Sequence, residues 1–202
     1  MRVNKGLMIA ATFDPTKRTS LITVADMCRK IEENSISLPL YQRDISWTLQ
    51  KCIDLLNYQL WGKAPVSPIS INVINTVDSA VPQVSFIDRE IISTIERGQY
   101  SVVDGQQRLT TNYKAYCNHD DFRNIVLDLG KGEFTEVRDS IRSNQIPVGI
   151  LLNKEDTKLF EYTKAKSALG SADVLSVLLQ VRSKMRNYNY TLNSCLLYTS
   201  PS

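Results

Sequence analysis

The residues of this chain that are best suited to chemistry form a short run near its middle, with the letters DGQQR at residues 104–108 (the DGQQR turn). A β-branched run at 100–103 precedes it and a helical pattern over 106–116 follows it, which predicts a strand, a turn and a helix in that order. Gly105 lets the backbone approach a ligand closely, and the N–H groups at the start of a helix attract phosphate. Arg108 can add a bidentate contact to phosphate oxygens.

Two further roles are open to the side chains of this turn. Asp104 could hold Mg²⁺, and Gln106 or Gln107 could orient a water, as a glutamine does in some GTPases. A purely structural interpretation is also open, in which Asp104 caps the helix and pairs with Arg108 four residues later. The run is not a Walker A motif, because no GxxxxGK[ST] sequence occurs in the chain. The turn alone does not decide between these interpretations.

A second candidate segment lies earlier, at residues 38–43 with the letters LPLYQR (the LPLYQR segment). Its proline fixes an extended backbone, so Gln42 and Arg43 can reach across a cleft to another loop. Alternatively, Arg43 is a solvated surface side chain and the nearby Trp47 is a core residue. If both segments serve one ligand, Arg43 and Arg108 must converge on one cleft, because like charges come together only around an anion or carboxylates.

Hydrophobic periodicity predicts helices alternating with strands, the pattern of an α/β or α+β domain. Ser46 is expected to cap the second helix and Gly62 to end it, while Gly170 and Ser171 separate the last two helices. Residues 146–152 fit either a strand or a packed loop. The expected helices are 24–34, 47–61, 106–116, 154–169 and 172–186, and the expected strands are 69–73, 84–87, 100–103 and 125–129.

Composition and charge argue against several classes of protein. The net charge of +3 is too small to indicate a nucleic-acid partner by itself, and the four cysteines form no CxxC pair of the kind that binds zinc. No apolar run approaches the ~20 residues that span a membrane, so a cytoplasmic protein without a membrane partner is expected. The single histidine, His119, is interpreted as part of a polar loop. Triads and HNH nucleases need histidine, and most need more than one, and the sequence shows no recognisable carboxylate cluster for a nuclease metal, so the chain is expected not to cut DNA.

Together and in this order, the two segments resemble the N-terminal domain family of GmrSD-type modification-dependent restriction endonucleases. The resemblance covers roughly residues 20–190, and the DGQQR turn after a strand is its most specific part. It implies a ParB/sulfiredoxin-like fold, in which a small mixed sheet is flanked by helices and followed by a helical C-terminal part. It also implies nucleotide binding and hydrolysis, coupled to DNA defence against modified phage genomes.

The resemblance also assigns roles to individual residues. Some residues match the family's nucleotide-site motif or its earlier segment, and one threonine continues the match. They are Gln42, Arg43, Asp104, Gly105, Gln106, Gln107, Arg108 and Thr110. It implies nucleotide binding by Gln42, Arg43, Gly105, Arg108 and Thr110, and hydrolysis by Asp104, Gln106, Gln107 and Arg108. Asp104 would then hold Mg²⁺. Which nucleoside triphosphate is bound stays open, because no base-reading residue is identifiable.

On this interpretation the chain divides into a loose N-terminal arm (1–20), a nucleotide-binding domain (21–150), a helical extension (151–194) and a tail (195–202). The tail, CLLYTSPS, resembles the translation of a sequencing adapter. It is therefore expected to be non-native, to pack against nothing and to be dispensable for folding, with the true gene continuing. Family members commonly carry a C-terminal HNH-type nuclease domain. The stretch 88–98, which includes a helical turn or an insertion at 90–97, is longer than the usual connection, and its role is left open.

Two functions compete. The first is a nucleotide-hydrolysing sensor or regulator domain of a restriction or phage-defence protein. The alternative is a ParB-like DNA-binding or regulatory module that uses nucleotide as a switch without appreciable turnover. A third, an interaction protein with a decayed nucleotide site, is disfavoured by the intact motif. Arg182, Lys184 and Arg186 could contact DNA phosphates or form a solvated helix face, and a homo-oligomer is left open.

Overall fold

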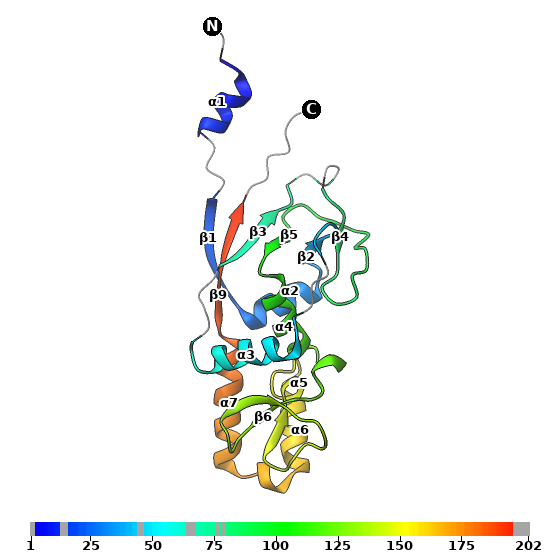
Figure 1. Ribbon diagram of the computed structural model, residues 1–202, viewed down its shortest axis with the longest axis vertical. Helices are drawn as coiled ribbons and strands as arrows, with labels where there is room; N and C mark the ends of the chain where they lie inside the picture. The colour runs from blue at the N-terminus through cyan, green and yellow to red at the C-terminus, as the bar shows by residue number, and fades with distance from the viewer. Residues whose placement is uncertain are drawn as a thin grey trace.

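The computed structural model describes residues 3–12, 16–43, 47–63, 68–75, 77 and 80–195. Within these ranges the chain forms a mixed α/β fold, which confirms the predicted class. The larger of its two sheets has six strands. In Figure 1 this large sheet lies in the upper part of the molecule, and a region of helices with the smaller sheet lies in the lower part.

The large sheet has the strand order β1-β9-β3-β5-β2-β4. Two of its neighbouring pairs, β9 with β3 and β5 with β2, are parallel, and the other three pairs are antiparallel. The strands are β1 (Thr16–Thr23), β2 (Ile36–Pro39), β3 (Ile69–Val73), β4 (Gln83–Val84), β5 (Tyr100–Asp104) and β9 (Asn189–Cys195). Strand β5, which leads into the DGQQR turn, therefore lies inside the sheet, between β3 and β2.

Helices α2 (Val24–Glu32) and α4 (Gln106–Tyr116) share a hydrophobic core with the large sheet. The Thr23 hydroxyl caps α2 by accepting a hydrogen bond from the Asp26 N–H at 3.1 Å. On its inner face α2 buries Met27, Cys28 and Ile31, at the spacing that the sequence predicted for a helix over 24–34.

A second hydrophobic core fills the lower region, under helix α3. The small sheet there has the order β7-β6-β8 and is antiparallel throughout. The elements that pack around this core or beside it are α3 (Leu49–Leu60), η1 (Asp120–Phe122), β6 (Ile125–Asp128), β7 (Glu133–Glu136), β8 (Gln145–Pro147), α5 (Val148–Leu151), α6 (Thr157–Ala165), η2 (Ser167–Leu169) and α7 (Ala172–Arg186).

Side-chain caps begin several of these helices. Thr48 caps α3, whereas the predicted cap Ser46 lies outside the described residues. Ser171 caps α7 by accepting from the Val174 N–H at 3.3 Å, as predicted. His119 caps the short η1 helix through its Nδ1 atom, so its interpretation as a polar loop residue is confirmed.

Some elements differ from the sequence prediction. The single helix expected over 154–169 is divided into α6 and η2, because Lys166 between them has extended backbone angles. Gly170 has a φ of −84°, so it is not the left-handed glycine that ends a long helix. The chain turns at Lys166 and buries Leu169 completely, so tertiary packing overrides the local periodicity.

Three shorter predictions also need correction. Residues 146–152 divide into the end of β8 and the helix α5, where a strand or a packed loop was expected. The strand expected at 84–87 is the two-residue strand β4. Residues 90–97 form no helical turn and run as an irregular segment with one bridge, between Val84 and Ile91.

The two ends of the described chain meet in the large sheet. Residues 5–12 form α1 (Lys5–Thr12) and Thr16–Thr23 form β1, so residues 16–20 of the arm expected over residues 1–20 belong to the large sheet. Strand β1 pairs along its length with β9. The predicted helical extension, residues 151–194, therefore ends in a strand. Pairing between strands from opposite ends of the chain depends on the tertiary structure, so local sequence patterns do not predict it.

The tail prediction is wrong at its first residue. The backbone of Cys195 pairs with Thr16 of β1 and Asn72 of β3, so this position belongs to the sheet. Residues 196–202, on which the rest of that prediction falls, lie outside the described residues.

Arg182, which the sequence offered as a DNA contact or a solvated side chain, is a buried structural residue. Its guanidinium donates to the Leu151 and Asn153 carbonyl oxygens at 2.6 and 2.7 Å and to the Asp156 carboxylate at 2.6 Å. Arg186 adds a contact to the same carboxylate at 3.0 Å. These bonds hold the loop between α5 and α6 against α7. Both guanidiniums are therefore engaged within the protein, where the sequence had left open a DNA contact or a solvated helix face.

We expect Arg182→Ala to lower the free energy of unfolding by about 1–3 kcal/mol, because two carbonyl groups lose a buried donor. The exposed neighbour Lys184 provides the control, since Lys184→Ala should change stability by less than about 0.5 kcal/mol. Urea unfolding of the two variants measures the difference. Equal stability of both variants would contradict the structural role of Arg182.

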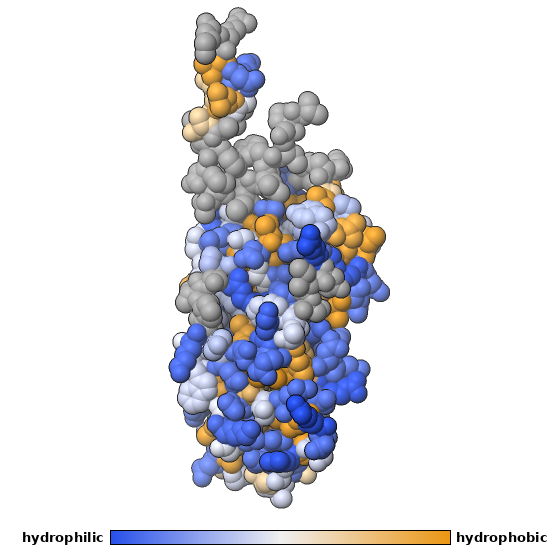
Figure 2. Space-filling view, in the orientation of Figure 1, coloured by the Kyte–Doolittle hydropathy of each residue, from blue (hydrophilic) through white to orange (hydrophobic). Residues whose placement is uncertain are grey.

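Apolar side chains are distributed unevenly between the surface and the interior of the protein. In Figure 2 hydrophilic residues cover most of the lower region on the visible face, with smaller hydrophobic areas between them. The apolar side chains of the described residues gather mainly in the two cores. Among the helices described here, none combines the length and the apolar character needed to cross a lipid bilayer.

Candidate functional site: a basic cleft at the start of α4

A cleft of about 290 Å³ opens where β5 passes into α4. Its walls come from both candidate segments, and the lining residues are Gln42, Arg43, Trp47, Asp104, Gly105, Gln106, Gln107 and Arg108. The predicted convergence of Arg43 and Arg108 on one cleft is therefore confirmed. Among the described lining residues there are two arginines and one carboxylate, that of Asp104, so the cleft carries the charge that suits an anion.

Gly105 makes the turn between β5 and α4. Its φ of +97° lies in the left-handed region, and a Cβ atom at this position would stand 2.3 Å from the Cδ1 atom of the buried Ile69. The residue acts as the N-cap of α4 without any side-chain hydrogen bond to the helix start. The alternative in which Asp104 caps this helix is therefore wrong. The Asp104 side chain is 75% exposed and stands at the rim of the cleft.

Arg108 is held in place by its own chain. Its Nη2 atom donates to the Pro68 carbonyl oxygen at 3.2 Å and lies 3.7 Å from the Asp104 carboxylate, which confirms the predicted pairing of residues four apart. Only 14% of the Arg108 side chain is exposed. Since a guanidinium carries five N–H donors in a rigid fork, Arg108 can bond Pro68 and still face the cleft with a fixed orientation.

Two hydrogen bonds join the LPLYQR side of the cleft to the DGQQR side. The Trp47 N–H donates to the Gln107 side-chain oxygen at 3.0 Å, and the Gln42 side-chain amide donates to the Val103 carbonyl oxygen at 3.2 Å. Gln106 is only 7% exposed although it lines the cleft. These bonds explain how segments far apart in sequence form one site.

Sequence reasoning missed Arg89, which comes from the stretch 88–98. Arg89 has a φ of +57°, unusual for a residue with a side chain, and its Nη2 atom donates to the Gln42 carbonyl oxygen at 2.6 Å. The other terminal nitrogen, Nη1, is buried and has no hydrogen-bond partner within the described ranges, and the same is true of the Gln42 side-chain oxygen. The long connection thus supports the LPLYQR segment from outside, which no local pattern indicated.

A buried polar network also supports the helix from behind. The Tyr190 hydroxyl of β9 accepts hydrogen bonds from the side chains of Gln59 at 2.7 Å and Asn112 at 3.1 Å. Asn112 donates at 2.9 Å to the Arg108 carbonyl oxygen as well. The first turns of α4 are therefore tied to α3 and β9, which limits movement of the Arg108 backbone.

Thr110 is the predicted site residue that the structure does not bring to this cleft. It lines a neighbouring pocket further along α4, which shares Trp47 and Gln107 with the cleft. The other predicted residues all line the cleft, although this placement does not test their roles in binding or hydrolysis.

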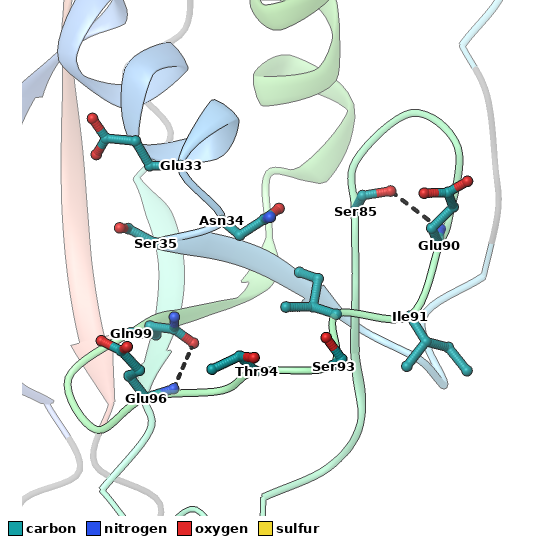
Figure 3. Close-up of a pocket in the computed structure, with 11 residues that line it drawn as sticks. Glu33, Asn34, Ser35, Ser85, Glu90, Ile91, Ser93, Thr94, Glu96 and Gln99 are labelled. Carbon is teal, nitrogen blue, oxygen red and sulfur yellow. Dashed lines mark hydrogen bonds between the residues drawn. The ribbon is translucent and has the colours of Figure 1, made fainter.

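A polar hollow of about 460 Å³ lies on another side of the upper region, between the turn after α2 and residues 85–99 (Figure 3). Three glutamates, Glu33, Glu90 and Glu96, are among the residues that line it. Two hydrogen bonds shape the segment, from the Glu90 N–H to the Ser85 hydroxyl and from the Glu96 N–H to the Gln99 side-chain oxygen, each 3.1 Å. The hollow is larger than the basic cleft, but its negative charge repels phosphate.

Fold and cleft together define a mixed α/β domain with a basic site at a strand–turn–helix junction. Residues 24–197 match the family described as the GmrSD restriction endonuclease, N-terminal domain, and this chain belongs to that family. No curated protein matches the sequence.

Proposed function

We propose that this domain binds a nucleoside triphosphate with Mg²⁺ in the basic cleft and hydrolyses it, and that this activity regulates DNA cleavage in a restriction or phage-defence system. The observation that carries the proposal is the meeting of Arg43 and Arg108 at the start of α4. Like charges are brought together where an anion or carboxylates offset them. Asp104 supplies one carboxylate against two arginines, and the N-terminal end of a helix adds to the remaining positive potential. Membership of a family named for restriction endonucleases supports the biological setting.

The residues present fit a magnesium ion that arrives with the triphosphate. Mg²⁺ is usually held by one or two carboxylates plus phosphate oxygens and water. Asp104 offers one well-exposed carboxylate at the rim of the cleft. No group of three or more His, Cys, Asp or Glu side chains forms a metal site in the part of the chain that the structure describes. In this proposal Asp104 holds the ion, and the two arginines hold the phosphates.

A second candidate function, a nucleotide switch without appreciable turnover, is favoured by one contact. The Gln107 side-chain oxygen already accepts the Trp47 N–H, and this bond joins the two sides of the cleft. Hydrolysis would instead need the same side chain to orient a water. A triphosphate in the cleft would then stabilise the joined arrangement of Trp47 and α4 and report its presence to the rest of the protein.

Calorimetric titration of the chain with ATP, GTP, CTP and UTP, with and without Mg²⁺, tests the proposal when it is combined with an assay of released phosphate. We expect binding of at least one triphosphate that Mg²⁺ strengthens, followed by slow release of phosphate. Binding without release of phosphate supports the switch. If neither the four nucleotides nor inorganic triphosphate bind at millimolar concentration, the proposed function is wrong.

A further inference from the structure

A second pocket of about 230 Å³ lies beside the basic cleft, along the same face of α4. It shares the side chains of Trp47 and Gln107 with the cleft, and its other lining residues are Leu49, Cys52, Thr110, Thr111, Lys114, Asp121 and Phe122. An apolar cavity of about 150 Å³ is large enough to hold a benzene ring, so this pocket has room for a flat heterocycle.

The walls of this pocket combine apolar surface with a few polar groups. Trp47 provides an aromatic side chain against which a ring can stack, and Leu49 and Phe122 add apolar surface. Lys114 and Asp121 form an ion pair at 2.5 Å on the same wall, and they offer a donor and an acceptor side by side. The Lys114 hydrogen bond holds the pKa of Asp121 below its usual value, so the carboxylate is ionised at neutral pH.

Two neighbouring threonines of α4 behave differently. The Thr111 hydroxyl donates to the Gln107 carbonyl oxygen at 2.8 Å, the usual bond for a threonine within a helix. The Thr110 hydroxyl oxygen is buried and has no hydrogen-bond partner in the described chain. A buried hydroxyl without a partner is unfavourable for folding. Because Thr110 also lines this pocket, rotation of its side chain toward a ligand would supply the missing partner.

The spacing along α4 relates this pocket to the cleft. A helix rises about 1.5 Å per residue, so Thr110 lies about 7.5 Å and Lys114 about 13.5 Å beyond Gly105 along the helix axis. A ligand with phosphates at Gly105 and a ring near Thr110 or Lys114 would therefore lie along one face of α4. A nucleotide has this construction, with a ribose between its phosphates and its base.

We infer that the second pocket receives the base of the nucleotide whose phosphates occupy the basic cleft, with Thr110, Lys114 and Asp121 contacting the edge of the base. This inference rests on the proposed function and extends it to base recognition. The carboxylate of Asp121 accepts from an N–H group of the base and the ammonium of Lys114 donates to a ring nitrogen or carbonyl oxygen. Preference among the four bases is thus set in this pocket, whereas affinity for phosphate is set in the cleft.

The test compares the four nucleoside triphosphates with inorganic triphosphate, using the full chain and the variants Thr110→Val and Asp121→Asn. We expect the wild-type protein to bind its preferred nucleotide at least tenfold more tightly than inorganic triphosphate. Thr110→Val should weaken that nucleotide threefold or more and leave inorganic triphosphate unchanged. Asp121→Asn should alter the order of preference among the four bases. Thr157→Val, an exposed change in α6, serves as the control.

Thermal unfolding separates this role from a structural one. Because the Thr110 hydroxyl has no partner in the described chain, Thr110→Val should leave the melting temperature of the free protein unchanged or raise it. Equal binding of nucleotide and inorganic triphosphate by the wild type overturns the inference while the proposed function stands. The inference is also overturned if Thr110→Val binds nucleotide normally. It is overturned as well if Asp121→Asn weakens the binding of all four nucleotides equally, because this pocket would then hold the ribose. Failure of the wild type to bind either ligand overturns both.

Discussion

Gly105→Ala is expected to lower the free energy of unfolding by about 2–4 kcal/mol, because it combines backbone strain with overpacking. The backbone of Gly105 has a φ of +97°, which a residue with a Cβ adopts only at a cost. The new methyl group would also lie 2.3 Å from the Cδ1 atom of Ile69, whose side chain is completely buried and has little room to move.

Gly98→Ala is the matched control for this change. Gly98 has a similar φ of +94°, but nothing lies within 4 Å of the position where its Cβ would stand. It should therefore show the backbone strain alone, about 1 kcal/mol. Urea unfolding of both variants measures the two contributions. If Gly105→Ala is no less stable than Gly98→Ala, the close approach of Ile69 to the turn does not constrain this position.

Arg108→Ala is expected to weaken binding of the preferred nucleoside triphosphate tenfold or more. The loss of a charge-assisted contact to phosphate corresponds to about 1.5–3 kcal/mol. Arg108→Lys should restore only part of the affinity, since a lysine keeps the charge but lacks the planar fork that bonds two oxygens. Titration of each variant with Mg²⁺ and nucleotide gives the dissociation constants.

Arg108 also donates to the Pro68 carbonyl oxygen, so stability has to be measured beside affinity. We expect Arg108→Ala to remain folded, because its hydrogen bond to Pro68 and its 3.7 Å ion pair with an exposed carboxylate each contribute little to stability. Arg138→Ala, at an exposed position after β7, controls for the change in net charge. A folded Arg108→Ala protein with the nucleotide affinity of Arg138→Ala would contradict the role of Arg108.

The strand, turn and helix around the DGQQR motif could be predicted from sequence because each depends on near neighbours. β-Branched residues favoured β5, the glycine permitted the left-handed turn, and apolar spacing placed α4 over 106–116. The same reasoning placed α7 at 172–186 with Ser171 as its cap. Convergence of Arg43 and Arg108 was also predicted, but only because two separate motifs were interpreted together as one site.

Contacts between distant parts of the chain were decided by the tertiary structure alone. Strand β1 exists because β9 pairs with it from the other end of the chain, whereas its own sequence predicted a loose arm. Arg182 is buried because three acceptors, at the end of α5 and in the loop that leads to α6, surround its guanidinium, although its sequence context is that of a surface helix. Arg89 reaches the Gln42 carbonyl oxygen from an irregular connection that has no periodicity to read.

The sequence by itself therefore determined the α/β class, the family and most residues of the basic cleft, since these follow from local patterns and from two short motifs. The tertiary structure decided which of the two neighbouring pockets along α4 each residue lines. It placed Thr110 one turn beyond the cleft, in a pocket with Lys114 and Asp121, because successive turns of a helix present their side chains to different neighbours. Those neighbours, α3 and the η1 segment, come from other parts of the chain, and only packing brings them there.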